Sequence, residues 1–346
     1  MKNIIRKIIY QRFYQPILDK KVNFPKKKFF LINKGNLYPD KIFYVIQRYP
    51  GFGLFSNLAF VLNHIKIAKS LGFIPIVDMQ NFPTIYNEKY KLFNTSNSWE
   101  YYFEQLSKFS LEEVYKSKNV ILTDNRFYSK DLGFFSNITD SKDLVSILNN
   151  DIKLKKNKLN LIKSMKNRLF EDKKILGVHF RGTTYKTAGV VYAITKNQMI
   201  NKINEILSKE NYDKIFLVTE DVGNFDSIVN YFKDKVVFLN TSKRGKTDLE
   251  VWDNYSRSRH RYKLGRDILV ETYLLSFCDG FIDIETNPRA IAHGLNLNPN
   301  QKRYTIDNGH NKSWPIFNHI KYSWYIKNLL PEKFGGFANN TKPKKK

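Results

Sequence analysis

Short runs of strand-forming residues alternate with helical patterns along this chain, and this alternation limits the folds that it can adopt. Residues 41–46 are rich in Ile, Phe, Tyr and Val and stop at a glycine-proline turn. Over residues 58–71 the apolar positions stand three and four apart, which predicts a helix that ends at Gly72. Residues 73–78 predict a second strand. A strand, a helix and a strand in this order form the unit of a parallel α/β sheet.

The second half of the chain repeats the alternation, which predicts a second α/β domain. Strands are predicted near 174–181, 214–218, 236–239 and 280–284, and helices at 196–207, 225–232, 267–277 and 289–295. The lysine-rich stretch 153–158 and the helical pattern after it place the boundary between the two domains near residues 150–170. We therefore predict a basic N-terminal arm (1–35), two Rossmann-like domains (36–160 and 161–330) and a basic tail (331–346).

Composition excludes several classes of protein. A chain of 346 residues is long enough for two domains, and 15% aromatic residues exclude wholesale disorder. No run of about 18 apolar residues is present to span a bilayer. The single cysteine, Cys278, excludes a disulfide framework and a cysteine metal cluster. Because residues 1–10 also lack the features of a signal peptide, we expect a cytoplasmic protein.

The net charge of +26 is concentrated at the ends of the chain. Residues 1–28 carry a net charge of +8, and four lysines of the tail add +4. Isoleucines and aromatic residues interleave with the first basic residues, which predicts an amphipathic helix at the inner face of an anionic membrane. The alternative is a helix that packs on its own domain, or a solvated arm. Nucleic acid is a weaker interpretation, because no zinc finger, ribonucleoprotein motif or helix-turn-helix accompanies the charge.

The segment from Gly177 to Lys186 reads Gly-Val-His-Phe-Arg-Gly-Thr-Thr-Tyr-Lys and is the main indication of function. It continues a predicted strand, and it directs a guanidinium at Arg181 and a flexible backbone at Gly182 toward one point. A guanidinium fork and backbone N–H groups are what the binding of a phosphate requires.

Three further loops follow predicted strands, at residues 51–57, 219–221 and 285–287. The carboxyl ends of parallel strands face the ligand crevice of such sheets, so we expect all four loops to meet in one cleft between the domains. Each loop alone is weak evidence: a glycine pair before a helix is more often a tight turn, and 219–221 is equally well a helix cap.

Together the four loops resemble the motifs of the fucosyltransferase superfamily of the GT-B fold, and the resemblance covers most of residues 41–310. The superfamily includes α-1,6-fucosyltransferases, protein O-fucosyltransferases and bacterial enzymes of surface polysaccharides. Residues 51–57 are similar to its glycine-asparagine loop, 178–183 to its His-x-Arg motif, and 217–221 to its Leu-x-Thr-[Asp/Glu]-Asp strand end. Residues 267–279 are similar to the helix that precedes its Ser-Ser or Ser-Asn loop, which here is Thr286-Asn287.

The resemblance implies a site for a GDP-sugar. Arg181 would bind the β-phosphate and offset the charge of the leaving group, while His179 and Glu271 would contact the guanosine. The donor-binding residues that it implies are Gly53, Asn57, His179, Arg181, Gly182, Thr183, Lys186, Thr219, Asp221, Glu271, Thr286 and Asn287. Three departures bear on the choice of sugar, and one of them is Tyr185, which replaces a lysine of several relatives although Lys186 is one step away. Thr184 stands where relatives usually carry Asp, and Pro288-Arg289 stands where small or apolar residues are common.

The reaction implied is an inverting transfer that depends on Arg181 and needs no metal ion and no cofactor. The one acidic pair after a predicted strand that resembles a metal-binding motif is in Asp283-Ile284-Glu285. Asp78 and Glu100 are the carboxylates that we predict as general base, although each is more often structural than catalytic at such positions.

The predicted function is transfer of fucose, or of a related GDP-linked sugar, to a bacterial surface glycan such as lipopolysaccharide or capsule. One alternative is a nucleotide-binding protein of polysaccharide assembly that has lost activity. The other is a basic protein that binds nucleic acid.

Overall fold

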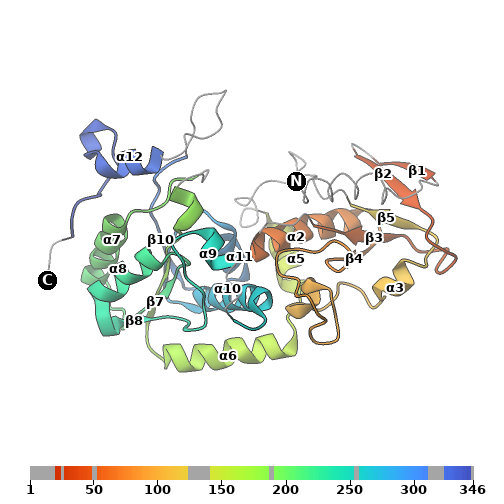
Figure 1. Ribbon diagram of the computed structural model, residues 1–346, viewed down its shortest axis with the longest axis horizontal. Helices are drawn as coiled ribbons and strands as arrows, with labels where there is room; N and C mark the ends of the chain where they lie inside the picture. Colours follow the sequence, from red (N-terminus) through yellow and green to blue (C-terminus); the bar gives the residue numbers. More distant parts are fainter. Residues whose placement is uncertain are drawn as a thin grey trace.

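The computed structural model describes residues 20–24, 27–48, 53–123, 141–186, 191–252, 257–310 and 323–343. Within these ranges the chain forms two α/β lobes, each built around a five-stranded sheet (Figure 1). We call them the first lobe and the second lobe in chain order.

The sheet of the first lobe has the order β1-β2-β5-β3-β4. Strand β3 lies parallel to both β4 and β5, whereas β1 and β2 form an antiparallel hairpin that joins the sheet through β5. The strands are β1 (Lys20–Phe24), β2 (Lys27–Ile32), β3 (Phe43–Ile46), β4 (Ile74–Val77) and β5 (Val120–Leu122). Helix α2 (Leu54–Ser70) connects β3 to β4 and ends before Gly72, whose φ of +67° favours glycine. The remaining helical segments are η1 (Ser98–Tyr101), α3 (Leu111–Val114) and α5 (Lys142–Asn150).

The sheet of the second lobe is parallel throughout, in the order β10-β9-β6-β7-β8. Its strands are β6 (Ile175–His179), β7 (Lys214–Val218), β8 (Val236–Val237), β9 (Gly280–Asp283) and β10 (Lys302–Thr305). All five residues of β6 are buried, as expected of a strand that is covered on both faces. The main helices are α6 (Lys156–Phe170), α7 (Lys196–Lys209), α8 (Val222–Phe232), α9 (Asp248–Trp252), α10 (His260–Phe277), α11 (Asn287–Leu295) and α12 (Ser323–Leu329). Short turns η3 (Thr183–Lys186), η4 (Lys233–Lys235) and η5 (Glu332–Phe334) complete it.

The two lobes share one apolar core. A continuous cluster of buried side chains includes Leu58 and Ile65 of α2 together with Leu274 of α10 and Ile291 of α11. Close to the start of α10, a Cβ atom on Gly265 would lie 2.3 Å from the hydroxyl oxygen of a first-lobe tyrosine, so only glycine fits there. The lobes are therefore held against each other by packing as well as by the chain connection through α6.

The predicted α/β class is confirmed: the second sheet is parallel throughout, and the first sheet is mixed, with β3, β4 and β5 parallel. The predicted helices and strands match α2, α7, α8, α10 and α11 and β3, β4, β6, β7, β8 and β9, with ends that differ by a few residues and an α10 that begins seven residues earlier. The hairpin β1–β2 and strands β5 and β10 were not predicted. No helix within the described ranges has the length and apolar character needed to cross a membrane.

The predicted domain limits stay predictions, but the structure shows where they fall. Residue 160 lies inside α6, which links the two sheets. Residues 1–19, where the amphipathic helix is predicted, lie outside the described ranges, and residues 27–32 of the predicted arm form β2. In the predicted tail Phe337 is 3% exposed and packs near Trp324, and Asn201 of α7 donates to the carbonyl of Thr341, so the tail up to Thr341 packs on the second lobe.

Candidate functional site

The segment after β6 and the segment after β7 lie side by side at the carboxyl edge of the second sheet. The N–H of Phe180 donates to the carbonyl of Val218 at 2.9 Å, which extends the pairing of the two strands beyond their ends. A Cβ atom on Gly182 would lie 2.5 Å from the side chain of Asp221. Glycine at this position therefore lets the backbone come close to the acidic pair that follows β7.

One oxygen atom of Glu220 accepts three donors from the segment after β6. The Arg181 guanidinium lies 3.0 Å from Oε1 of Glu220, the N–H of Gly182 lies 3.0 Å from it, and the hydroxyl of Thr183 lies 2.9 Å from it. The side chains of Arg181 and Glu220 are 25% and 16% exposed. The loop thus presents a cation, a backbone N–H and a hydroxyl to one anionic oxygen at a position that solvent reaches.

Asp221 also binds the segment after β6 through hydrogen bonds. Its Oδ1 atom accepts the N–H of Asn224 at 2.9 Å and so caps α8, which is the structural role that the sequence left open. Its Oδ2 atom accepts Lys186 Nζ at 2.6 Å and the N–H of Thr183 at 3.2 Å. Burial raises the pKa of Asp221, but the hydrogen bonds from Lys186 and from the N–H of Asn224 lower it, and the net shift is downward. Thr219 accepts the N–H of Asp221 and completes the turn.

His179 and Thr286 meet beneath the loop. Nδ1 of His179 lies 3.3 Å from the hydroxyl of Thr286, which also accepts the N–H of Arg289 and caps α11. Burial lowers the pKa of His179 to about 4, so its imidazole is neutral at neutral pH. The side-chain oxygen of Asn287 is buried and has no hydrogen-bond partner among the described residues.

Asp283, the first residue of the acidic pair that resembles a metal-binding motif, lies beside an arginine and a histidine of α11. Asp283 is fully buried, and its oxygens lie 3.2 Å from Nε of Arg289 and 3.0 Å from Nε2 of His293. Arg289 of α11 therefore pairs with the carboxyl group of Asp283, the last residue of β9. In the described part of the chain no three His, Cys, Asp or Glu side chains gather to hold a metal ion.

Glu271 of α10 is buried behind the loop after β8. The hydroxyl of Ser242 donates to Glu271 Oε1 at 2.5 Å. Burial is the main reason why the pKa of Glu271 is raised to about 8. Nearby, the Arg244 guanidinium lies 4.1 Å and 5.2 Å from the ring centres of Phe225 and Phe238. This corner therefore combines a protonated carboxyl group, a cation and two aromatic rings.

The first lobe contributes Gly53 and Asn57 at the start of α2. Gly53 is the residue before the helix, and Oδ1 of the buried Asn57 accepts Nε of Arg48 at 3.1 Å. Arg48 follows β3, is 2% exposed, and stacks 4.4 Å from the ring centre of Phe60. Gly51 and the residue after it, the other members of the predicted glycine loop, lie outside the described ranges.

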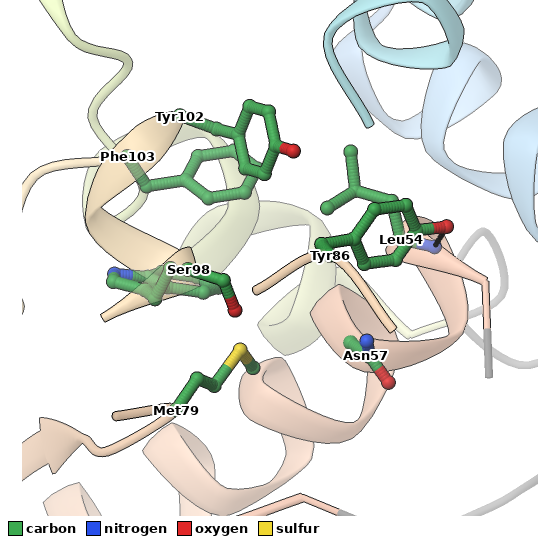
Figure 2. A pocket seen from close by; sticks show the side chains of 8 residues that line it. Leu54, Asn57, Met79, Tyr86, Ser98, Tyr102 and Phe103 are labelled. Atoms are coloured by element: carbon green, nitrogen blue, oxygen red, sulfur yellow. Dashed lines mark hydrogen bonds between the residues drawn. The ribbon is translucent and has the colours of Figure 1, made fainter. Parts of the chain in front are cut away.

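Tyr86 lies beside the start of α2, and the charge of Arg181 acts on it. Its hydroxyl accepts the N–H of Leu54 at 2.7 Å, as the dashed line in Figure 2 shows. Burial raises the pKa of Tyr86, while the Leu54 N–H and the charge of the nearby Arg181 lower it. Beneath Tyr86 lies a small cavity, at the lower limit of the room that a single water molecule needs. It is lined by Leu54, Asn57, Met79, Tyr86, Ser98, Trp99, Tyr102 and Phe103 (Figure 2).

Asp78 and Glu100 do not join this arrangement. Asp78 follows β4, as predicted, and is fully buried; its oxygens accept two backbone N–H groups, the amide of Asn81 and the hydroxyl of Tyr115. Glu100 accepts hydrogen bonds from Thr95, Asn97 and Gln105. Both carboxylates thus hold loops of the first lobe, and their role as general base stays a prediction.

The structure brings most of the predicted residues together. Arg181, Gly182, Thr183, Lys186, Thr219 and Asp221 are linked by hydrogen bonds and ion pairs into one network with Glu220. His179 and Thr286 form a separate buried pair at the same edge of the sheet. Glu271 lies apart from this network; the charge of Glu220 is the smallest of the contributions to its raised pKa. Sequence reasoning missed Arg48 and Tyr86 and placed no role on Glu220. Arg48 lies two residues after a predicted strand, as Arg181 does after β6, so its position at the carboxyl edge was a signal that could have been used; Tyr86 has no such signal.

No protein-family profile and no curated protein matches this chain. Among solved structures it is similar to the fucosyltransferase NodZ from Bradyrhizobium, with 15% identity and a TM-score of 0.45 over 73% of this chain and 92% of the other. It is also similar to FUT1 from Arabidopsis thaliana in complex with GDP, with 10% identity and a TM-score of 0.42 over 82% and 74% of the two chains. The apo form of POFUT1 gives 8% identity and a TM-score of 0.39 over 77% and 98%.

Proposed function

We propose that this protein is an inverting glycosyltransferase that transfers fucose, or a related sugar, from a GDP-sugar to a lipid-linked surface glycan. The observation that carries the proposal is the convergence of Arg181, the N–H of Gly182 and the hydroxyl of Thr183 on one anionic oxygen. The motifs of the sequence, which resemble those of fucosyltransferases, support GDP as the nucleotide.

Oxygen atoms of a diphosphate fit the position that Glu220 Oε1 now occupies. A phosphate oxygen accepts the same three donors, and the guanidinium of Arg181 offers a second N–H for a forked contact. The exposure of Arg181 allows a ligand to reach it. We therefore infer that the β-phosphate of the donor replaces the carboxylate of Glu220 on Arg181.

In the proposed reaction a hydroxyl oxygen of the acceptor attacks the anomeric carbon of the donor sugar. The bond between that carbon and the β-phosphate oxygen breaks, and GDP leaves with the bonding electrons. The hydroxyl proton passes to a base, for which Asp78 and Glu100 remain the proposed groups. Arg181 stabilises the negative charge that grows on the leaving oxygen, which is the contribution that speeds such a step most. Because this cation is already in place, we propose that no metal ion is needed.

Glu271 allows a test of whether the nucleotide carries guanine. Guanine offers two neighbouring N–H donors, and a carboxylate accepts both, whereas the protonated carboxyl group has a donor of its own facing them. Since burial raises the pKa of Glu271 to about 8, binding of guanine should release a proton at neutral pH. ADP and UDP lack this pair of donors and should release none.

Titration calorimetry of GDP, ADP and UDP tests the proposal. We expect GDP to bind most tightly, with a binding enthalpy that changes with the ionisation enthalpy of the buffer, and Glu271→Gln to remove that buffer dependence. Hydrolysis of GDP-fucose, compared with other GDP-sugars, then tests catalysis. Binding of GDP without any turnover of a GDP-sugar would leave a nucleotide-binding protein of polysaccharide assembly. Absence of GDP binding would contradict the nucleotide site altogether.

A further inference from the structure

The surface of α12 and η5 carries an unusual group of exposed apolar side chains. Ile326, Leu329, Leu330 and Phe334, which we call the α12 surface, are 58%, 83%, 39% and 65% exposed. Of the eleven large apolar side chains that are well exposed in the described part of the chain, five lie within residues 325–334. Such clustering on an otherwise polar protein marks an interaction site, whereas single exposed apolar residues do not.

The opposite face of the same segment is fixed to the second lobe. Trp324 is 8% exposed, and its Nε1 donates to the carbonyl of Ala193 at 2.7 Å. Lys327 donates to the carbonyl of Gly335 at 2.7 Å, which joins the helix to the turn that follows η5. The α12 surface is therefore presented outward by a segment that is anchored, at the edge of the second lobe (Figure 1).

Charge identifies the partner that fits this surface. Residues 323–346 contain six lysines and one glutamate, a net charge of +5. Lys333 and Lys342 are exposed on the described part of this segment. Leucine, isoleucine and phenylalanine side chains next to lysines are the composition of segments that lie in the interface of an anionic bilayer.

We propose that the α12 surface docks on anionic lipid membranes, with its apolar side chains among the acyl chains and its lysines at the headgroups. The surface is next to the candidate site: the Lys186 ammonium, which pairs with Asp221, lies 5.7 Å from the ring centre of Trp324 on the inner face of α12. Docking there would bring the carboxyl edge of the second sheet near the membrane surface. The membrane docking rests on the proposed function in one respect: it would bring the candidate site close to a lipid-linked acceptor.

Flotation with vesicles tests the docking on the whole chain. We expect binding to vesicles of equal parts phosphatidylglycerol and phosphatidylcholine, and little binding to phosphatidylcholine alone. The double variant Leu329→Ser/Phe334→Ser should bind the anionic vesicles at least about tenfold more weakly, because two large side chains no longer enter the bilayer. Tyr90→Ser, which removes a side chain that is 84% exposed on the first lobe, is the matched control and should bind as the parent chain does.

A second variant, Lys333→Glu/Lys342→Glu, tests the electrostatic part and should also weaken binding to anionic vesicles. Unchanged vesicle binding by Leu329→Ser/Phe334→Ser would overturn the proposal. A dimer in sedimentation that this variant abolishes, with no binding of the parent chain to vesicles, would overturn it too and assign the surface to a second copy of the chain. GDP affinity is measured on the same samples, so failure of the docking and failure of the nucleotide site are separate results.

Discussion

The two sheets carry the same pair of charges at their carboxyl edges, but in different surroundings. In the first lobe Arg48 follows β3 and Asp78 follows the neighbouring strand β4, and these side chains are 2% and 0% exposed. In the second lobe Arg181 comes after β6 and Glu220 after its neighbour β7, with side chains 25% and 16% exposed.

The difference indicates which edge is available to a ligand. Asp78 accepts four hydrogen bonds from its own lobe and is sealed from solvent, so exchanging any of them for a ligand would leave buried donors unpaired. Arg181 and Glu220 pair with each other where water reaches both. A contact of that kind exchanges at small cost, because solvent or a ligand replaces the lost partner. The exposure of the second edge therefore favours it as the place where the proposed ligand binds, whereas the first edge is closed within its own lobe.

The largest effect that we expect is that of Arg181→Ala on turnover. Removing a cation that stabilises the leaving group should lower the rate of GDP-sugar turnover by about 10²–10³-fold. Thermal stability should change little, because the Arg181 side chain is partly exposed. Rates with saturating GDP-fucose and melting curves of the same samples measure the two effects.

Arg181→Lys serves as the control for charge alone. It keeps a cation but loses the planar fork, so its rate should fall between those of the parent chain and Arg181→Ala. A large loss of stability in Arg181→Ala, with the rate preserved, would remove the distinction between the two edges.

The second prediction concerns His179, which is sealed although it lies at the open edge. Its pKa is about 4 in the folded chain and near 6.5 when unfolded. As pH falls from 6.5 to 4 the unfolded chain gains a proton that the folded chain does not bind. The His179 contribution to stability, up to about 3 kcal/mol, is therefore present above pH 6.5 and is lost over this range.

Denaturant unfolding at several pH values checks this against His179→Gln, in which the contribution is absent. The comparison with the variant is needed because Glu271 has the opposite effect. Its pKa is raised from 4.5 to about 8 in the folded chain, so its contribution to the free energy of unfolding is lost as pH rises from 4.5 to 8. If the free energies of unfolding of the parent chain and of His179→Gln change in parallel between pH 4 and 6.5, the pKa of His179 is not lowered by burial.

The fold was largely readable from the sequence because buried strands and amphipathic helices leave periodic patterns. Strands β6 and β7 are apolar runs, and α2 is followed closely by Gly72, so both signals are local. Edge strand β10, with the sequence Lys-Arg-Tyr-Thr, has mostly exposed side chains and no such pattern. It forms because it pairs with β9, and pairing between distant segments leaves no local trace.

The site was readable only in part, for the same reason. Position after a strand gives the edge on which a residue lies, and this placed Arg181 and Asp221 correctly together. Whether the edge is open depends on segments from elsewhere in the chain. Arg48 is covered by Phe60 of α2, and Asp78 is bound by Tyr115, which is 37 residues away. Which of the two adjacent carboxylates contacts Arg181 also depends on the pleat of the strand end, which motif matching does not resolve.

The third prediction concerns the buried carboxyl edge of the first sheet and uses the variant Asp78→Asn to test whether this carboxylate is structural. The amide keeps one acceptor but turns an N–H group toward donors that the carboxylate now accepts, such as the hydroxyl of Tyr115. We expect a loss of about 2 kcal/mol in the free energy of unfolding, measured in denaturant, and unchanged GDP affinity. If Asp78 is instead the general base, the rate of transfer to an acceptor will fall far more than stability does. Glu100→Gln, measured in the same assays, applies this criterion to the other proposed base.

The smallest effect that we expect is a gain, from Glu220→Gln. The amide oxygen can still accept the N–H of Gly182 and the hydroxyl of Thr183, so the loop keeps its shape, but the negative charge that holds Arg181 is gone. GDP should then bind about three- to tenfold more tightly in calorimetry, since the phosphate no longer competes with a carboxylate in a partly solvated site. Glu210→Gln is the matched control: this carboxylate pairs with Lys302, the first residue of β10, and so lies at the amino edge of the same sheet. Weaker binding of GDP to Glu220→Gln alone would mean that Glu220 contacts the nucleotide itself, and that the open edge is built from both of its charges.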